Sequence, residues 1–266
     1  MTRCTTASSD PLSTVSEDRH WWFASRTRAL LALMDARLPG TGAKVLDVGC
    51  GAGNMFHHLS RYGSVQGIEI DPRPVAMARR RGYSVEQGDA SRGVAYPEAS
   101  FDVVTVLDVI EHIGDDRAVL CEAARLLKPA GHLVVTVPAF MALWSHNDDI
   151  NAHRRRYTAA ELRLKLRQAG FSILRLTYNN FFAFPFAAAL ILLRRRTRQA
   201  PQLASHHLSQ DEYQVEMEPA PPVVNALLTG AGWLEAQLLR CMDLPVGTGI
   251  IAVAQKQPVT PDSTVW

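Results

Sequence analysis

The stretch Val45-Leu46-Asp47-Val48-Gly49-Cys50-Gly51-Ala52-Gly53-Asn54 joins an apolar strand to a loop that has a glycine at every second position. Glycine lacks a Cβ atom and tolerates positive φ, so such a loop turns tightly and lets the backbone touch a ligand. A helix expected near 54–62 would offer its free N–H groups beside the loop. The stretch therefore predicts a cradle for a nucleotide-like cofactor at the end of a strand.

An acidic residue on the next predicted strand indicates which cofactor this is. Glu69 lies twenty residues after Gly49, where an acid reaches ribose hydroxyls in doubly wound sheets. A dinucleotide site would have the spacing G-x-G-x-x-G, which these glycines lack. Asp47 would also repel a phosphate, whereas it would attract ammonium and sulfonium groups. The residues favour S-adenosylmethionine, and a nicotinamide-dependent oxidoreductase is the alternative from another class.

Residues 45–138 resemble a class I S-adenosylmethionine-dependent methyltransferase. Five motifs occur in the order typical of that family: LDVGCGAGN (46–54), GIEIDP (67–72), QGDA (87–90), FDVVTVLDVIEH (101–112) and LLKPAGHLVVTVP (126–138). One glycine loop would be weak evidence, but five ordered motifs are improbable by chance. The resemblance implies a Rossmann-like fold and methyl transfer.

The resemblance also implies roles for single residues. Asp89 would bind the adenine amino group, Ala90 would donate a backbone N–H to the ring, and Asp108 would face the methionine moiety. His112 would shield the cofactor or support it from behind. The expected cofactor residues are Arg26, Asp47, Gly49, Gly51, Gly53, Glu69, Ile70, Asp89, Ala90, Asp108 and His112.

The segment His20-Trp21-Trp22-Phe23-Ala24-Ser25-Arg26 precedes an amphipathic helical pattern and resembles an HWWFxxR signature of a bacterial methyltransferase subgroup. Its aromatic side chains either contact the substrate or pin the helix to the sheet. Trp22 and Phe23 are therefore candidate substrate contacts. The guanidinium of Arg26 has the geometry to bind the cofactor carboxylate.

Strand and helix patterns alternate through the centre of the chain. Strands are expected at 45–48, 65–70, 83–86, 101–107 and 131–138, and helices at 54–62, 73–81 and 115–127. This alternation predicts an α/β, Rossmann-like, doubly wound sheet with helices on both faces. By resemblance, 171–176 and 249–254 would add a closing antiparallel pair. The segment between them is too long for a plain loop, so 179–247 is expected to be a helical insertion or cap, with a helix at 222–240.

Composition limits the remaining classes. The chain is 47% hydrophobic and 20% charged with a net charge of +2, which is typical of a globular protein and gives no support for a nucleic-acid partner. Four cysteines without a CxxC pair indicate neither a metal site nor a disulfide framework, so a cytoplasmic protein is expected. We expect a disordered lead over 1–18, without a secretory signal, one domain over 19–257 and a frayed tail over 258–266.

The segment after the fifth strand is the best place for a general base. Histidine titrates near neutrality and can take a proton from a hydroxyl, so His153 is the first candidate, His146 the second and Tyr157 the third. In the structural interpretation, His153 or Tyr157 instead caps the helix that begins near Thr158 or anchors the loop. Trp144 is a candidate substrate contact, and one of the arginines at 154–156 is expected in a buried ion pair.

A run of apolar residues at 181–193 is followed by Arg194, Arg195, Arg196 and Arg198. The run is shorter than the roughly twenty residues that span a bilayer. A peripheral anchor at the inner face of the membrane, an acceptor tunnel, a buried helix and a dimer contact all fit this composition. Asn180, just before the run, is a further candidate acceptor contact.

These residues favour methyl transfer to an oxygen of an amphipathic or lipid-like small molecule. Carbon methylation of a prenyl or polyketide-type acceptor is the alternative within the class, with Trp22, Phe23 and Tyr157 steadying a cation. A catalytically silent, membrane-associated binding module would require decayed cofactor motifs, and these motifs are intact. The oligomeric state has no sequence signal.

Overall fold

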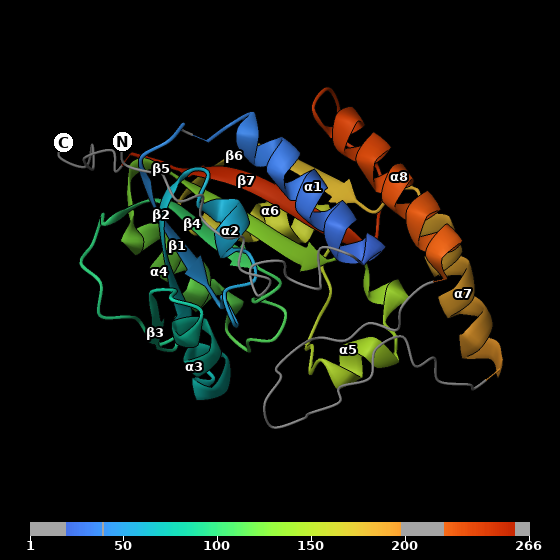
Figure 1. Ribbon diagram of the computed structural model, residues 1–266, viewed down its shortest axis with the longest axis horizontal. Coiled ribbons are helices and arrows are strands. Elements are labelled where there is room, and N and C mark those ends of the chain that lie inside the picture. The colour runs from blue at the N-terminus through green and yellow to red at the C-terminus, as the bar shows by residue number, and fades with distance from the viewer. Residues whose placement is uncertain (1–19, 39, 198–220, 259–266) are drawn as a thin grey trace, which may run out of the picture.

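The computed structural model describes residues 20–38, 40–197 and 221–258. Its sheet has seven strands in the order β3-β2-β1-β4-β5-β7-β6 (Figure 1). β7 is antiparallel to β5 and β6, and the other neighbours are parallel. The prediction of a mostly parallel, doubly wound sheet with a closing antiparallel pair is confirmed. The strands are β1 (Ala43–Val48), β2 (Gly63–Glu69), β3 (Val85–Gln87), β4 (Phe101–Leu107), β5 (Leu127–Pro138), β6 (Phe171–Asn179) and β7 (Gly249–Lys256).

Helices separate most of the strands through β5, except β3 from β4; α5 and α6 lie between β5 and β6, and α7 and α8 form the insertion between β6 and β7. They are α1 (Trp21–Asp35), α2 (Phe56–Leu59), α3 (Pro72–Arg80), α4 (Asp116–Leu126), α5 (His146–Ile150), α6 (Ala159–Gln168), α7 (Phe184–Thr197) and α8 (Pro222–Leu239), with a 3-10 turn η3 at Met141–Leu143. α8 confirms the helix expected at 222–240. No helix in the described part of the chain combines the length and apolarity needed to cross a bilayer.

Two element boundaries differ clearly from the prediction. The helix expected at 54–62 is the single turn α2, because β2 begins at Gly63 rather than at residue 65. Gly63 has a φ of 153°, and a Cβ atom there would overlap the backbone oxygen of Ala43. The close pairing of β1 with β2 therefore starts at this glycine. β5 begins at Leu127, where the α4 helix was expected to end, because that residue already pairs with Phe101 of β4.

The two faces of the sheet bury different helices. On β4, Val104 and Val106 belong to a buried cluster with α4 and α6, whereas Val103 and Leu107 belong to a second cluster with α1 and α8. This alternation follows from the two-residue period of a strand. Asp47 shares a face with Val45 on β1, so its carboxyl group lies on the α1 side of the sheet.

The insertion is fastened to α1 and to the end of β6. α8 packs along α1 so closely that a Cβ atom at Gly232 would overlap the Ser25 hydroxyl. Glu235 of α8 accepts hydrogen bonds from the backbone N–H groups of Asn180 and Phe181, at 2.6 and 2.7 Å. These contacts fix the turn that follows β6. The lead over 1–18, residues 259–266 of the expected tail, and Arg198 lie outside the described residues.

Candidate active site

The glycine loop lies against a cavity of about 660 Å³ at the carboxyl ends of β1, β2 and β4, which we call the glycine-loop cavity. Gly49, Gly51 and Gly53 have φ values of 70°, 53° and 77°, a region that favours glycine. A Cβ atom at Gly53 would lie 2.6 Å from the Tyr83 ring. The cavity is lined by every predicted cofactor residue except Gly53: Arg26, Asp47, Gly49, Gly51, Glu69, Ile70, Asp89, Ala90, Asp108 and His112.

Glu69 is held at the end of β2 by the backbone. Its Oε2 accepts the Gly51 N–H at 3.0 Å, and its Oε1 accepts the Asp71 N–H at 2.9 Å. The carboxylate therefore ties the glycine loop to the second strand and keeps further lone pairs for a ligand. Beside it, Ile70 is 60% exposed and offers an apolar surface to the cavity.

Asp89 follows β3, on the far wall of the glycine-loop cavity. Its Oδ1 accepts hydrogen bonds from the N–H and the hydroxyl of Ser91, at 2.9 and 2.6 Å. Its Oδ2 lies 3.2 Å from Arg92 Nε in an exposed ion pair. The turn thus orients the Asp89 carboxylate and places Ala90 against the same cavity.

Asp47 is the buried acid of the glycine-loop cavity. It is 3% exposed, and its Oδ1 accepts a 2.6 Å hydrogen bond from the Thr105 hydroxyl. Burial raises the pKa of its carboxyl to about 7, and the hydrogen bond and the charge of Arg26 oppose this shift. Its carboxylate form is a natural partner for a ligand cation, since that cation would replace lost hydration.

Arg26 of α1 and Asp108 after β4 form an ion pair of 2.9 Å. Asp108 has a φ of 55°, and its Oδ1 accepts a hydrogen bond from the Thr136 hydroxyl at 2.9 Å. The Arg26 guanidinium also lies 5.8 Å from the centre of the Trp22 ring. These contacts hold both charges rigidly at one border of the cavity.

A second cavity of about 780 Å³ shares Phe23, Arg26, Asp108 and His112 with the first, so the two adjoin. We call it the histidine cavity. Four of the predicted catalytic or substrate residues line it: Trp22, Phe23, His153 and Asn180. Apolar walls come from Val137, Pro138 and Ile150. The cavity is therefore shaped for a partly apolar ligand beside the glycine-loop cavity.

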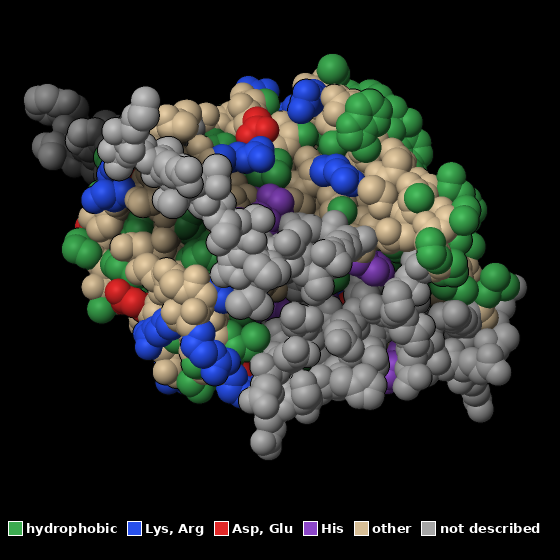
Figure 2. Space-filling view, in the orientation of Figure 1, with side chains coloured by type: hydrophobic (Ala, Val, Ile, Leu, Met, Phe, Trp, Pro, Cys, Tyr) green, Lys and Arg blue, Asp and Glu red, His purple; other side chains and the backbone are tan. Residues whose placement is uncertain are grey.

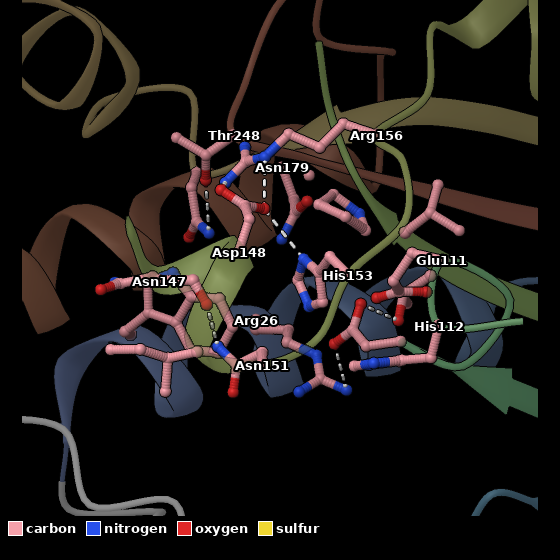
Figure 3. Close-up of a pocket in the computed structure, with 18 of the residues that line it drawn as sticks. Arg26, Glu111, His112, Asn147, Asp148, Asn151, His153, Arg156, Asn179 and Thr248 are labelled. Atoms are coloured by element: carbon pink, nitrogen blue, oxygen red, sulfur yellow. Dashed lines mark hydrogen bonds and ion pairs between the residues drawn. The ribbon is translucent and has the colours of Figure 1, made fainter. Parts of the chain in front are cut away.

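His153 is oriented by a buried carboxylate. Its Nδ1 lies 2.8 Å from Asp148 Oδ1, and Figure 3 shows the ring between Asp148 and the pair Glu111 and His112. Arg156 donates to both oxygens of Asp148, at 2.7 and 2.9 Å. Burial raises the pKa of the Asp148 carboxyl, but the hydrogen bonds from His153 and Arg156 outweigh it and hold the pKa well below the usual range. Arg156 is thus the predicted arginine of a buried ion pair.

Glu111 and His112 follow β4 at the wall of the histidine cavity. Glu111 is fully buried, and neither of its carboxyl oxygens has a hydrogen-bond partner. Burial, followed by the charge of Asp108, raises its pKa well above the usual value. Burial lowers the pKa of His112, which favours a neutral ring. Polar atoms of Glu111, His112 and His153 lie within 4.8 Å of one another, close enough to surround one small ligand atom or ion.

Besides Gly53, three predicted site residues do not line either cavity. Tyr157 is 2% exposed, and its hydroxyl donates to Asp116 Oδ2 at 2.8 Å. It therefore anchors the loop before α6, as in the structural interpretation, and neither the catalytic role nor the cation-binding role fits this buried position. Trp144 donates its indole N–H to Asp149 at 3.0 Å and lines neither cavity. His146 begins α5 as its first residue and is not part of the wall, although the next residue, Asn147, is.

Several residues of the histidine cavity were not predicted. Glu111 stands at the carboxyl end of a central strand, a position that in itself signals a site residue. Asp148 follows His146 within the polar segment that was singled out, so it carried a signal too. Asn179 and Thr248 had none, because they meet only through the pairing of β6 with β7.

The family comparison defines the class of the protein. A model of the methyltransferase domain matches residues 19–176, more than half of the chain, so the chain belongs to that family. The glycine cradle, Glu69 and the buried Asp47 fit the adenosine, ribose and cationic groups of S-adenosylmethionine. The family and the cavity together identify S-adenosylmethionine as the cofactor of this domain.

Two similar proteins of known name come from bacteria. One is the ubiquinone biosynthesis O-methyltransferase of Xanthomonas oryzae, 36% identical over 142 residues, which are 46% of this chain and 59% of that protein. The other is the demethylmenaquinone methyltransferase of Tropheryma whipplei, 31% identical over 159 residues, which are 57% of this chain and 56% of that protein. The chain thus spans somewhat over half the length of these relatives.

Solved structures share the fold at low identity. The [4+2]-cyclase SpnF has a TM-score of 0.56 at 22% identity, covering 89% of this chain and 82% of that chain. A putative sarcosine dimethylglycine methyltransferase from Galdieria sulphuraria has a TM-score of 0.56 at 17% identity, covering 88% and 86%. Because one of these is a cyclase, the fold by itself leaves the reaction open, and the residues of the site must be used to argue it.

Proposed function

We propose that this protein transfers the methyl group of S-adenosylmethionine to an oxygen of an amphipathic or lipid-like small molecule held in the histidine cavity. The observation that carries the proposal is the hydrogen bond between His153 and Asp148, because it orients an imidazole in a cavity that adjoins the cofactor site. When bound, S-adenosylmethionine supplies a methyl group already activated on a sulfonium.

The chain's own part in this chemistry is proton removal. Asp148 accepts the Nδ1–H of His153, so Nε2 is the atom with a free lone pair. Arg156 keeps Asp148 ionised, and the carboxylate in turn stabilises an imidazolium. Nε2 would take the proton of an acceptor hydroxyl, which raises the nucleophilicity of its oxygen. General-base help of this kind contributes roughly a hundred- to ten-thousand-fold.

Positioning is the second contribution. Arg26 and Asp108 lie at the shared border, where the methyl group has to pass from one cavity to the other. Trp22 and Phe23 pack edge to face with ring centres 5.0 Å apart and close the same border. Holding two reactants in line and away from water supplies much of the acceleration in such a transfer.

The acceptor class rests on the cavity walls and on the relatives. Polar and charged side chains make up most of the lining, and the aromatic and aliphatic residues Trp22, Phe23, Val137, Pro138 and Ile150 add an apolar part, which suits a ring that carries both a hydroxyl and an apolar tail. The two similar proteins are named for ubiquinone and demethylmenaquinone, both quinone-type molecules. Carbon methylation is less well supported, because Tyr157 is buried away from the cavity and Arg26 already lies over Trp22.

The test is methyl transfer in defined mixtures. The protein would be incubated with S-adenosylmethionine and a panel of phenols and quinols with and without a prenyl tail, and products would be identified by mass spectrometry and fragmentation. We expect an O-methyl product, with the tailed phenols preferred. A product methylated on ring carbon would contradict the oxygen assignment.

We further propose a peripheral contact with the bilayer through α7 and α8. Apolar side chains project into solvent from both helices, and Figure 2 shows them as a nearly continuous band along one edge of the molecule. They are Phe186, Leu190 and Leu193 on α7, and Val223, Val224, Leu227, Trp233 and Leu234 on α8. The Arg194–Arg196 run continues α7 in the sequence. An apolar face next to arginines suits an anionic membrane surface, where a lipid-like acceptor would be found.

A further inference from the structure

Among the described residues, Glu111 is a buried acid without a hydrogen-bond partner. Its carboxyl group is fully buried, and both oxygens lack a hydrogen-bond partner. An unpaired buried carboxylate is strongly unfavourable, so the group is either neutral or completed by a ligand. Because Glu111 lines the histidine cavity, the charge of its carboxyl group can depend on what the site binds.

The charged and polar groups that line the histidine cavity with Glu111 come from several elements. Asp108 and His112 belong to its own loop, Arg26 comes from α1, and Asp148 comes from α5. His153 and Arg156 come from the segment before α6, and the turns at the ends of β6 and β7 add neutral Asn179, Asn180 and Thr248. The pKa of Glu111 is raised first by burial and then by Asp108, while Arg26 and Arg156 oppose the shift.

The cofactor changes this balance because its sulfur changes charge. S-Adenosylmethionine carries a sulfonium cation, and S-adenosylhomocysteine carries a neutral thioether at the same place. Asp108 and His112 line both cavities, so a cofactor bound in the glycine-loop cavity with its methyl group toward the histidine cavity would have its sulfur near these two residues. Glu111 lies between these two residues in the chain and lines the histidine cavity with them, and a cation near a buried acid favours its ionised form.

We propose that Glu111 exchanges one proton in step with the charge of the cofactor sulfur. In the empty site Glu111 is a neutral acid, and it becomes a carboxylate when the sulfonium binds. It becomes neutral again when the sulfur becomes a thioether. The first half of this exchange needs the cofactor alone, and the second half rests on the proposed O-methylation.

The second half balances as follows. The O–H bond of the acceptor breaks, and its proton passes to His153 Nε2 and then, through a bridging water, to a Glu111 oxygen; the two side chains share no direct hydrogen bond, and their polar atoms lie within 4.8 Å. The oxygen lone pair forms the new O–CH₃ bond, and the S–CH₃ bond breaks with its electron pair left on sulfur. One positive charge is lost at sulfur and one negative charge is lost at Glu111, so the net charge of the site is unchanged.

The test counts protons on cofactor binding, with no acceptor present. Titration calorimetry in two buffers of equal pH and different ionisation enthalpy gives the number of protons released. At pH 7 we expect S-adenosylmethionine to release more protons than S-adenosylhomocysteine, with a difference of up to about one. Glu111→Gln should abolish the difference and still bind S-adenosylhomocysteine. The exposed Glu98→Gln control should keep the difference.

Further comparisons distinguish proton exchange at Glu111 from proton release at Asp47 and from metal binding. Asp47→Asn should lower the proton count for both ligands equally, because both carry the same ammonium group. Equal counts for the two ligands in the wild-type protein would overturn the proposal whether or not Glu111→Gln folds. The proposal would also be overturned if the wild-type protein bound one divalent ion per chain, if Glu111→Gln lost that ion, and if the difference in proton release required it. Glu111, His112 and His153 would then form a metal site. Failure to methylate any hydroxyl would leave these binding results intact.

Discussion

The guanidinium of Arg26 lies 2.9 Å from the carboxylate of Asp108, and this ion pair stands where the glycine-loop cavity meets the histidine cavity. It links the first helix of the domain to the end of the central strand β4. The charges are mostly shielded from solvent, so either partner alone would be costly. Because both residues line both cavities, a ligand in either cavity would change the surroundings of this ion pair.

A first prediction concerns the ligand group that Arg26 serves. If Arg26 binds the cofactor carboxylate, Arg26→Ala should weaken S-adenosylhomocysteine binding by at least tenfold. Binding of methylthioadenosine, which lacks the amino-acid part, should change little, since the adenosine contacts are untouched. Calorimetry with both ligands makes the comparison. Equal loss for the two ligands would instead make Arg26 a structural partner of Asp108. Arg26→Lys should recover little, because a lysine lacks the planar fork.

A second prediction concerns the base. His153→Ala should lower turnover by at least tenfold while S-adenosylhomocysteine affinity stays close to that of the wild type, because a base acts on the acceptor proton. His146→Ala serves as the matched control, since this histidine begins α5 outside the cavity wall. Asp148→Asn should give an intermediate loss, because the ring loses its orienting carboxylate. An unimpaired His153→Ala enzyme would leave only positioning for this residue.

The glycine loop, Glu69 and the strand order were predictable because each depends on local spacing and on the two-residue period of buried strands. The dyad of His153 with Asp148 was only half predictable. The segment was singled out for its histidines, but the partner of His153 is set by the single turn α5. Tyr157 was misplaced for a similar reason. Its hydroxyl bonds to Asp116 of α4 on the same side of the sheet, and no short-range pattern encodes a contact between residues 41 positions apart.

A third prediction follows from the buried carboxyl of Asp47, whose pKa is raised from 3.8 to about 7. Between those values the folded protein binds more protons than the unfolded chain, so the free energy of unfolding falls as pH rises toward 7 and stays lower above it. Asp47→Asn should therefore raise the free energy of unfolding of the ligand-free protein at pH 8, by roughly 1–3 kcal/mol. Denaturant titration at pH 5 and pH 8 measures this, and an equal effect at both values would contradict the assignment.

Ionisation of the Asp47 carboxyl, which lowers the free energy of unfolding, should strengthen cofactor binding. S-Adenosylhomocysteine affinity should rise as pH increases through about 7, because the ligand ammonium prefers the ionised Asp47. Asp47→Asn should bind more weakly and lose this pH dependence. Calorimetry across the range provides the check, and a pH dependence that survives in the variant would place the titrating group elsewhere.

A fourth prediction tests the ribose contact and the choice of cofactor together. Glu69→Ala should weaken S-adenosylhomocysteine binding by roughly 1–3 kcal/mol, because ribose hydroxyls lose a charged acceptor. Glu69→Gln is the matched comparison and should lose less, since the amide oxygen still accepts a hydrogen bond. The wild-type protein should show no measurable binding of NAD. Tight NAD binding would contradict the cofactor assignment.

The last prediction concerns the exposed apolar side chains of α7 and α8 and the arginines at 194–196 and 198. In a sedimentation assay with anionic vesicles, the wild-type protein should pellet at low salt, with each arginine near the surface contributing about 1 kcal/mol. Added salt should release it, because the Debye length shortens. Replacing the four arginines with glutamine should move the protein to the supernatant while cofactor binding stays unchanged.

Two controls separate a specific anchor from bulk charge. Changing four exposed arginines on α3, α4 and α6 to glutamine removes the same charge elsewhere, and this variant should still pellet; the positions are Arg80, Arg117, Arg163 and Arg167. Leu227→Ser with Trp233→Ser should weaken binding even at low salt, because apolar burial is lost from α8. Both arms are needed, since a membrane contact of this kind combines apolar burial with charge. A wild-type protein that never pellets with anionic vesicles would assign the apolar face of α7 and α8 to a contact between protein chains.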